Sequence, residues 1–415
     1  MYLVYGLQKS GISITKLLEK KNKDFKVWDD NKSVRKEFRK LFNGNLFLKT
    51  ERLDYFDKIF VSPGISLRQQ RFQLNNPSVK IERDLNLYIS YLANQKIVAI
   101  TGTNGKSTTT KLIGDILNNN KINAFVGGNI GEPLCNVFLK NSKFRFHIIE
   151  LSSFQLEKIK NFNTTISIIT NLSNDHTDRY RNINDYINQK KKILTKTGIN
   201  LISIDDAFSR KIFSNKNTKN KISFSTFSSK ANVYIKDNII IDNYFKSCKK
   251  LNIKSVSKDL KGKFNSQNII IAYICCKILK IAEKNFLDVV KKFKGLPYRS
   301  KTIFENKYLK IINNSKSTNL NSALNSIENN DNIFLILGGI AKEKNFNILS
   351  NYKERVICTY VFGSSGFFIE NKIKKKIKVK RFKTLKQAIK EIFKDIKLNS
   401  KKSTILFSPA CSSYD

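Results

Sequence analysis

The stretch that most constrains the fold is "KIVAITGTNGKSTTTKLIGDIL", residues 96–117. Its apolar start predicts a strand, its glycines a tight turn, and the run that begins near Ser107 a helix. In this order the N–H groups of the turn and the positive end of the helix point at the same spot, which favours a bound phosphate. A strand, a glycine turn and a helix in succession are typical of α/β proteins with parallel sheets.

The spacing of the glycines differs from that of the common phosphate-binding loop. That loop has the pattern G-x-x-x-x-G-K-[ST]. Here Gly102 and Gly105 have only two residues between them, and Ile100 occupies the place of the first glycine. Lys106 and Ser107 still follow the second glycine, so an ammonium can bind phosphate and a hydroxyl can reach Mg²⁺. The alternative is an ordinary strand-to-helix turn in a lysine-rich chain.

Strand-and-helix alternation begins anew at three places. Apolar runs open at "YLVYG" (2–6), at "KIVAI" (96–100) and, after "GLPYRS", at "LKIINNS" (309–315). We therefore predict an α/β chain of three domains. These are a Rossmann-like domain at 1–92, a central ATP-binding domain with a parallel, P-loop-type sheet at 93–297, and a Rossmann-like domain at 298–415. Functional residues of such sheets lie beyond the carboxyl ends of the strands.

The net charge is the unusual feature of the composition. Lys and Arg number 76 against 33 Asp and Glu, a formal net charge of +43. Such an excess occurs in proteins that bind nucleic acids. However, the lysines are spread along the chain, and AT-rich codons encode Lys, Asn and Ile alike. We favour codon bias with anionic small substrates and expect no nucleic-acid partner.

The remaining composition bears on cellular location. No apolar run reaches the roughly 18 residues of a membrane span, and the start "MYLVYGLQKSG" is interpreted as a first strand rather than a signal peptide. The 6 cysteines form no C-x-x-C pair and the chain has 2 histidines, so we expect no zinc site. Scattered cysteines in a chain of this size indicate the cytoplasm.

Polar side chains follow two apolar runs of the central segment. Glu150, in "IIELSSFQLE", is well placed to hold Mg²⁺, and the alternative is a solvated strand end. His176, in "TNLSNDHTDRY", also follows an apolar run, with a structural role as its alternative. His147 stands in the middle of the run "FRFHIIE" and is interpreted as structural.

A lysine-rich helix is predicted at "DYINQKKKI", residues 185–193. From the residues alone, its three lysines are interpreted as a solvated basic face.

The first segment contains "GLQKSG", Gly6 to Gly11, which is similar to a dinucleotide fingerprint with Asp29 and Asp30 about 20 residues further on. Because Gln8 replaces the middle glycine, an NAD site is disfavoured. A nucleotide sugar bound in another way stays an alternative.

Together these stretches resemble the Mur ligase family, and within it the branch that adds D-glutamate. The loop "GTNGKST" is that family's variant of the phosphate loop. The other matching stretches follow in the family's order and span nearly the whole chain: "GGNIG" (127–131), "ELSSFQLE" (150–157), "NDHTDRY" (174–180), "YINQKKKI" (186–193), "GLPYR" (295–299), "NNSKSTN" (313–319), "LGGIAKEKNF" (337–346) and "SPACSSYD" (408–415).

The resemblance implies a reaction with ATP and two Mg²⁺ ions. The carboxylate of UDP-N-acetylmuramoyl-L-alanine is phosphorylated to an acyl phosphate, the amine of D-glutamate attacks it, and the amide, ADP and phosphate are released. Because a carboxylate and a triphosphate must meet, cations have to screen their repulsion. The resemblance also implies a monomer in the cytoplasm.

The resemblance also assigns residues. The catalytic set is Lys106, Glu150, His176, Lys190 and Arg299. The nucleotide contacts are Gly102, Thr103, Asn104, Gly105, Lys106, Ser107, Thr108, Asn265, Asn268, Arg299 and Asn314. The metal ligands are Ser107, Glu150, His176 and a carbamylated Lys190, which the family's Y-x-x-x-K spacing selects over its neighbours. The substrate contacts are Ser10, Asn129, Ser152 and Gln155 for the UDP-sugar, and Lys316, Thr318, Lys342 and Ser413 for D-glutamate.

Some positions depart from the family's pattern. Tyr298 and Phe264 stand where the family usually has histidine, and Ile340 lies in a "GGDGK"-type motif whose Lys342 survives. Asn314 replaces an aspartate near the nucleotide. The family continues beyond the counterpart of Asp415 for roughly another helix, so the C-terminal domain is expected to be truncated or its pocket completed otherwise.

Two other functions stay open on the sequence. One is another amide ligase with this loop, of the Mur or folylpolyglutamate synthetase type, against which "ELSSFQLE" and "SPACSS" argue. The other is a basic nucleic-acid-binding ATPase, motivated by the +43 charge but lacking a recognisable nucleic-acid motif.

Overall fold

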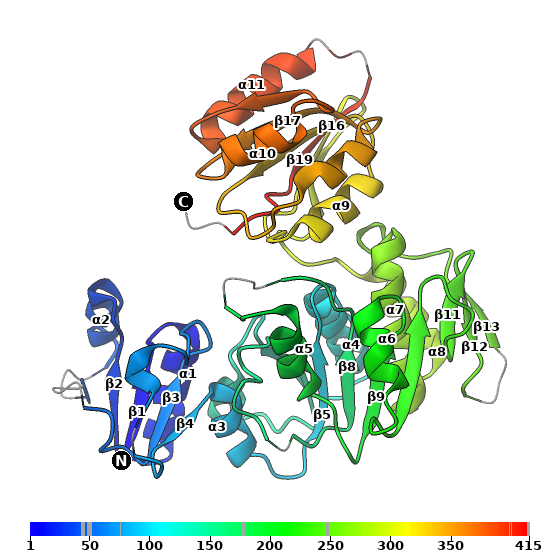
Figure 1. Ribbon diagram of the computed structural model, residues 1–415. Helices are drawn as coiled ribbons and strands as arrows, with labels where there is room; N and C mark the ends of the chain where they lie inside the picture. The colour runs from blue at the N-terminus through cyan, green and yellow to red at the C-terminus, as the bar shows by residue number, and fades with distance from the viewer. Residues whose placement is uncertain are drawn as a thin grey trace. The chain divides into compact units, whose positions relative to one another are not determined.

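A computed structural model gives the fold of the chain (Figure 1). It describes residues 1–415 except 43–45, 48–51, 75, 161, 176–178, 246–248, 398, 400 and 413–415, and omits the side chains of residues 249, 263 and 264. The chain forms two compact units. One comprises Met1–Ser173, Asn182–Ser255 and Gln267–Val290, and the other comprises Asn174–Arg181, Val256–Ser266 and Lys291–Asp415.

The first sheet contains four strands in the order β2-β1-β3-β4, all of them parallel. Apolar side chains of β1 and β3 are buried against helix α1, as the alternation in the sequence predicts. The strands are β1 (Tyr2–Tyr5), β2 (Phe25–Trp28), β3 (Lys58–Val61) and β4 (Lys80–Glu82), and the helices are α1 (Lys9–Lys20), α2 (Lys32–Arg39) and α3 (Asp84–Ser90).

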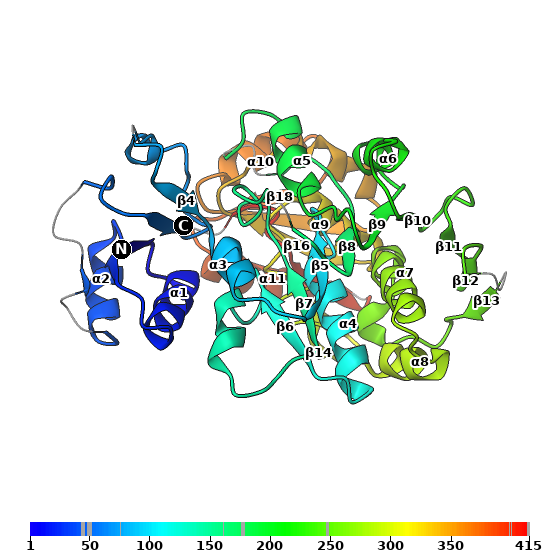
Figure 2. The ribbon, with the colours of Figure 1, turned by 90° about the horizontal axis from the view of Figure 1, so that it is seen from below.

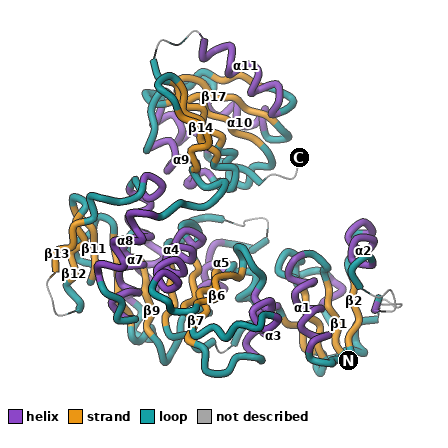
Figure 3. Tube along the Cα trace, turned by 180° about the vertical axis from the view of Figure 1, so that it is seen from behind, coloured by secondary structure: helices purple, strands orange, loops and turns teal. Residues whose placement is uncertain are grey.

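The second sheet has nine strands in the order β13-β12-β11-β10-β9-β8-β5-β7-β6 and lies in the same unit (Figure 3). The strands are β5 (Lys96–Thr101), β6 (Ala124–Gly128), β7 (Phe146–Glu150), β8 (Ile166–Ile169), β9 (Ile199–Ser203), β10 (Lys221–Ser225), β11 (Val233–Lys236), β12 (Ile239–Asp242) and β13 (Lys249–Asn252). The helices are α4 (Lys106–Asn119), α5 (Ile183–Lys191), α6 (Ala207–Ser214), α7 (Lys263–Ile278) and α8 (Glu283–Lys292), and α7 lies beside α8 in Figure 2.

The outer end of this second sheet differs from the parallel sheet that the sequence predicts. Strand β12 runs antiparallel to β11 and to β13. Asp237 and Asn238 connect β11 to β12 with φ angles of 52° and 59°. Two successive residues with positive φ form the tight hairpin turn that reverses the chain, so these strands cannot be parallel. The seven strands from β6 to β11 in the order of the sheet are parallel, and the change of direction begins at β12.

The third sheet lies in the other unit, in the order β14-β15-β19-β16-β17-β18. Its strands are parallel except β14, which pairs antiparallel with β15 across a short connection. The strands are β14 (Lys301–Glu305), β15 (Leu309–Asn313), β16 (Ile333–Gly338), β17 (Val356–Phe362), β18 (Val379–Arg381) and β19 (Ser403–Phe407), and the helices are α9 (Leu320–Glu328), α10 (Gly366–Ile373) and α11 (Leu385–Lys397).

The three sheets confirm the predicted α/β class, and each lies within one of the three predicted domains. The boundaries at residues 92 and 297 stay predictions, since the first two sheets share one compact unit. Among the helices that the structure describes, none combines the length and the apolar character that a membrane span requires.

Candidate active site

The glycine turn after β5 has a backbone that only glycine adopts easily. Gly102 and Gly105 have φ angles of 147° and 84°. A Cβ added to Gly102 would lie 1.9 Å from the Thr170 hydroxyl, and one added to Gly105 would lie 2.7 Å from Asn268 Oδ1. Helix α4 begins directly after the turn, at Lys106. The turn therefore presents backbone and the positive end of a fourteen-residue helix, as a phosphate site requires.

Asn171 fixes the shape of this turn and was missed in the sequence. Its Oδ1 accepts a hydrogen bond from Asn104 N at 2.9 Å, and its Nδ2 donates to Asn104 O at 3.0 Å and to Gln267 at 2.8 Å. Its carbonyl accepts from Thr103 N at 2.8 Å. An asparagine just after β8 could have been singled out by its place at a carboxyl strand end.

Two lysines converge on the turn. Lys106 Nζ donates to Gly102 O at 2.9 Å and to Thr103 O at 2.8 Å, while Lys190 Nζ donates to the same Gly102 O at 2.7 Å. Lys190 is 2% exposed and lies over the Tyr186 ring, with Nζ 4.9 Å from the centroid. The interpretation of Lys190 as part of a solvated face is therefore wrong, because helix α5 turns this one lysine into the protein.

Glu150 is buried at the end of β7, with 1% exposure. Ser107 Oγ donates to its Oε2 at 2.7 Å, and Asn129 Nδ2 donates to its Oε1 at 2.7 Å. The alternative of a solvated strand end is thus wrong, because parallel strands β5, β6 and β7 bring Glu150 between two other polar side chains. A buried carboxylate bonded to a hydroxyl offers the hard oxygen ligands that Mg²⁺ prefers.

Of the remaining nucleotide candidates, Asn268 contacts the helix that follows the loop. Its Oδ1 accepts from the Thr109 hydroxyl of α4 at 2.9 Å. Thr108 is half-buried on the same helix. Asn265 and Arg299 belong to the other unit, where Asn265 Nδ2 donates to the carbonyls of residues 259 and 261 and Arg299 is exposed.

The UDP-sugar candidates belong to the parts of the chain that form the first and second sheets, which share one compact unit. Ser10 is half-buried in the first turn of α1. Gln155 is 2% exposed, and its Oε1 accepts from the Ser152 hydroxyl at 3.1 Å while its Nε2 donates to Asp84 at 3.0 Å. Burial raises the pKa of the Asp84 carboxyl. These contacts make Gln155 a link between α3 and the segment after β7.

Three D-glutamate candidates, Lys316, Thr318 and Lys342, follow strands β15 and β16 of the third sheet. Lys316 is exposed, and Thr318 and Lys342 are half-buried. Asn314 is buried, its Oδ1 accepting from Ser300 N at 3.1 Å and its Nδ2 donating to the hydroxyls of Ser326 and Ser408 at 2.8 and 3.0 Å. An amide, unlike a carboxylate, donates these last two bonds.

Three further positions are the predicted metal ligand His176, the predicted D-glutamate contact Ser413, and His147, which was interpreted as structural. His176 and Ser413 lie outside the described residues. His147 is buried, and its Nδ1 lies 2.6 Å from the Tyr88 hydroxyl. Burial lowers its pKa to about 4, so the imidazole is neutral near pH 7 and its structural interpretation is confirmed.

The loop, the buried carboxylate and the parallel sheet define a ligase of the Mur class, which uses ATP. The protein-family model described as the Mur ligase middle domain matches residues 100–276 of this chain. The UDP-N-acetylmuramate-alanine ligase MurC from Thermotoga maritima shares the fold, with a TM-score of 0.63 at 17% identity over 99% of this chain and 96% of that chain. A pseudomurein peptide ligase type C from Methanothermus fervidus does so with a TM-score of 0.61 at 18% identity, over 98% and 96%.

Curated relatives narrow the class. The UDP-N-acetylmuramoylalanine–D-glutamate ligases of Rickettsia bellii and Rickettsia prowazekii are 34% and 36% identical, each covering 99% of this chain and 93% of the relative. That of Buchnera aphidicola is 36% identical, covering 100% and 93%. The chain belongs to the Mur ligase family and, within it, to the group of UDP-N-acetylmuramoylalanine–D-glutamate ligases.

Proposed function

We propose that this enzyme uses ATP to join D-glutamate to UDP-N-acetylmuramoyl-L-alanine in peptidoglycan precursor synthesis. The observation that carries the proposal is the cluster at the carboxyl edge of the second sheet, where Lys106, Lys190 and the Ser107–Glu150 pair surround one glycine turn. Relatives that cover nearly the whole chain carry the name of this activity.

The turn is suited to bind the triphosphate of ATP. Lys106 would exchange its bonds to Gly102 O and Thr103 O for bonds to phosphate oxygens, since its Nζ already lies at the turn. The N-terminus of α4 adds a partial positive charge at the same point. Together these groups would lower the repulsion between the triphosphate and the substrate carboxylate.

Ser107 and Glu150 would hold one Mg²⁺, which supplies positive charge to the phosphate oxygens when bound. For a second ion we propose Lys190 as a carbamate, with His176 as its companion. Two ammonium groups that share the acceptor Gly102 O repel each other, and an anion in place of the buried Lys190 ammonium would remove that repulsion. Addition of CO₂ to the neutral amine with loss of one proton would give Lys190 the negative charge of a metal ligand.

The remaining predicted residues are assigned to the UDP-sugar, the nucleotide and D-glutamate. Ser10, Asn129, Ser152 and Gln155 would contact the UDP-sugar. Asn265, Asn268, Arg299 and Asn314 would contact the nucleotide. Lys316, Thr318, Lys342 and Ser413 would bind D-glutamate, whose two carboxylates match the lysines. We also propose a cytoplasmic location, a monomer and no nucleic-acid partner. The spread of lysines along the chain, without a recognisable nucleic-acid motif, supports the last of these.

The test is the release of ADP from ATP with defined substrates. We expect release only when UDP-N-acetylmuramoyl-L-alanine and D-glutamate are both present. Turnover with L-alanine or a diamino acid, and none with D-glutamate, would contradict the proposal and favour another amide ligase. ATP hydrolysis stimulated by RNA or DNA, without ligation, would favour the nucleic-acid-binding ATPase.

A further inference from the structure

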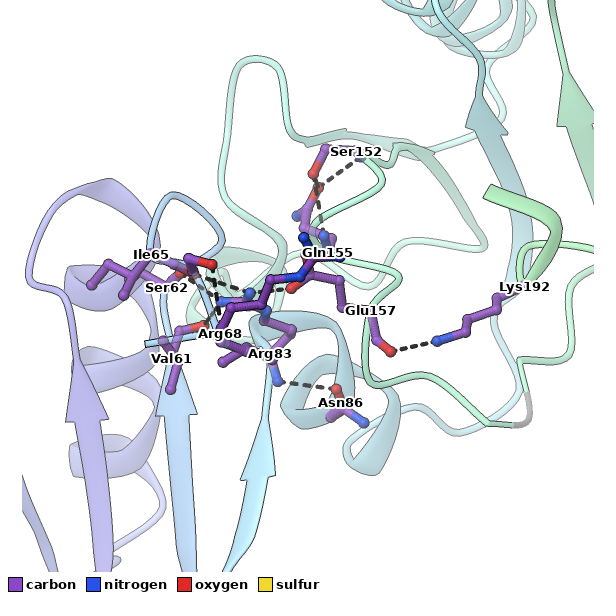
Figure 4. A network of polar contacts seen from close by, with 12 residues as sticks. Val61, Ser62, Ile65, Arg68, Arg83, Asn86, Ser152, Gln155, Glu157 and Lys192 are labelled. Carbon is purple, nitrogen blue, oxygen red and sulfur yellow. Dashed lines mark hydrogen bonds and ion pairs between the residues drawn. The ribbon is translucent and has the colours of Figure 1, made fainter. Parts of the chain in front are cut away.

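Arg83 is a fully buried arginine that the reaction does not use directly. It precedes helix α3, is 0% exposed, and its guanidinium faces the turn that follows β3 (Figure 4). One nitrogen, Nη1, donates to Val61 O at 3.0 Å and to Ser62 O at 2.8 Å, and the other, Nη2, donates to Ile65 O at 3.1 Å. A single side chain thus binds three carbonyls of the segment Val61–Ile65.

That segment belongs to the ligand edge of the first sheet. It follows the carboxyl end of parallel strand β3, and ligands of such sheets bind beyond the carboxyl ends. Ser62 Oγ donates to Gly6 O at 2.7 Å, so the segment also contacts the turn after β1 from which α1 and Ser10 begin. A change in the position of Val61–Ile65 would therefore move this edge.

The same guanidinium reaches the second sheet. Nη2 forms an ion pair with Glu157, whose side chain is 14% exposed. Glu157 ends the stretch that begins at Glu150 and contains Gln155. Its carbonyl accepts a hydrogen bond from Lys192 at the end of α5, the helix that carries Lys190. Figure 4 shows this line of contacts from Val61 through Arg83 and Glu157 to Lys192.

Two further contacts join the same two parts of the chain as the ion pair does. Buried Asp84, the neighbour of Arg83, accepts from Gln155 Nε2 at 3.0 Å. Arg68, which follows the same turn, lies 3.3 Å from Asp185 in the first turn of α5, although both side chains are substantially exposed. The second is a solvated pair of small energetic weight, so Arg83 and Asp84 carry the connection.

A buried ion pair is a weak source of stability. Removing two charges from water costs several kcal/mol per ion, and well-packed apolar residues in their place are often equally stable. What apolar residues cannot replace is direction, because a guanidinium with three carbonyls and one carboxylate has a fixed geometry. The contacts of Arg83 therefore point to alignment rather than to stability.

We infer that Arg83 is a positioning residue that aligns the ligand edge of the first sheet with the phosphate-binding edge of the second, acting through Glu157. The inference rests on the proposed function, in which the UDP-sugar extends from one edge to the other. Alignment matters most for the substrate that spans both edges, and misplacement by about 1 Å can slow a reaction roughly 100-fold.

The experiment replaces the pair by apolar residues. We compare the unaltered enzyme with Arg83→Met, Glu157→Met and the double variant. Arg52→Met is the control, since the exposed Arg52 pairs with Asp54 on the surface of the unit that contains the first sheet. For each we measure Tm, kcat, the KM values of UDP-N-acetylmuramoyl-L-alanine, ATP and D-glutamate, and the affinity for UDP alone by calorimetry.

We expect the double variant to be more stable than Glu157→Met, which leaves the guanidinium buried without its carboxylate. The kcat/KM of the double variant for the UDP-sugar should fall about 10- to 100-fold, while its KM for ATP stays within about twofold of the unaltered value. Glu157→Met keeps the bonds from Arg83 to the three carbonyls of the segment Val61–Ile65, so its UDP affinity should stay within about twofold while its kcat/KM for the UDP-sugar falls. The control should match the unaltered enzyme.

Unchanged kcat/KM for the UDP-sugar in a folded double variant would overturn the inference. A loss of UDP affinity in Glu157→Met as large as its loss of kcat/KM, or an equal rise of all three KM values, would also overturn it, because either result makes the Arg83–Glu157 pair a general structural feature. If the unaltered enzyme itself makes no product from D-glutamate, the proposed function fails instead, so the two failures are distinguishable.

Discussion

Two strand–turn–helix units in this enzyme use the same backbone device with opposite electrostatics. In both, a glycine with positive φ follows a parallel strand and a helix begins within a few residues, at Gly6 before α1 and at Gly105 before α4. In the first turn the carboxylate of Asp29 accepts a hydrogen bond from Leu7 N at 2.8 Å. In the second turn two lysines donate to Gly102 O.

The difference explains which turn suits a triphosphate. A carboxylate that accepts from a backbone N–H group leaves that group unavailable to a triphosphate, whereas ammonium groups and a helix N-terminus attract one. Glycines alone therefore do not identify a nucleotide site. The residues that distinguish the two turns come from elsewhere in the chain: Asp29 follows β2, and Lys190 lies on α5.

The largest effect is expected at the buried lysine of the second turn. Lys190→Ala should lower kcat at least about 100-fold, because it removes the proposed metal ligand from a buried position beside the glycine turn. Lys191→Ala, on the same helix and half-buried, is the matched control and should change kcat less than about twofold. Steady-state ADP release measures both, and equal losses in the two variants would disprove the assignment.

The next largest effect is expected at Glu150, the buried carboxylate beside the second turn. Glu150→Gln keeps the hydrogen-bonding shape but loses the charge, so we expect a Mg²⁺ requirement about tenfold higher and a lower kcat. Asp115→Asn, which removes the negative charge from the half-buried Lys111–Asp115 pair of α4, is the control. A titration of rate against Mg²⁺ concentration that is the same for Glu150→Gln and the unaltered enzyme would exclude Glu150 as a ligand.

Replacing one glycine at each turn by alanine tests whether the two turns bind different ligands. Gly105→Ala places a Cβ 2.7 Å from Asn268 Oδ1, and Gly11→Ala places one 1.9 Å from Gly6 O. The positive φ of Gly105 costs an alanine about 1–3 kcal/mol, whereas in Gly11→Ala the backbone must shift because the nearest atom is a carbonyl oxygen. We expect the first variant to raise the KM for ATP and the second to raise that for the UDP-sugar. Gly366→Ala, whose nearest contact is 3.7 Å, should leave both values unchanged. The same KM rising in both glycine variants would argue that the turns share one ligand.

The smallest effect concerns the contact between α3 and β7, where Tyr88 meets His147. Burial lowers the pKa of His147 from 6.5 to about 4. Between these pH values the unfolded chain binds a proton that the folded chain does not, so stability should fall as the pH drops from 6.5 towards 4. At pH 5 the loss is about 2 kcal/mol.

Urea unfolding at pH 7 and pH 5 measures that loss. His147→Gln removes the titrating group, so the difference between the two pH values should shrink by about the same 2 kcal/mol. An unchanged difference in His147→Gln would assign the pH dependence to other groups.

Local patterns in the sequence predicted most of the fold. Strands such as β5, β7 and β16 are continuous apolar runs, and their buried faces agree with the structure. The antiparallel strands β12 and β14 were not anticipated, since their direction depends on short turns rather than on alternation with helices. The third sheet's residues Lys316 and Lys342 stay predictions.

The candidate site was predicted where its residues carry a local signal, and Glu150 was found from its place at the end of an apolar run. Gly102 to Ser107 were found from their own spacing. Asn171 and Arg83 were missed, because an asparagine after a strand and an arginine before a helix acquire their roles only through contacts 67 and 74 residues away in the chain. The buried state of Lys190 likewise depends on the rotation of α5 and not on its composition.

The central claim is that the γ-phosphate passes to a carboxylate at the second turn. It is tested by UDP-N-acetylmuramoyl-L-alanine that carries ¹⁸O in its terminal carboxylate. An acyl phosphate transfers one of these oxygens to phosphate when the amine of D-glutamate displaces it. Mass spectrometry of the inorganic phosphate should therefore find one ¹⁸O atom per molecule of amide formed, and phosphate without the label would contradict the claim.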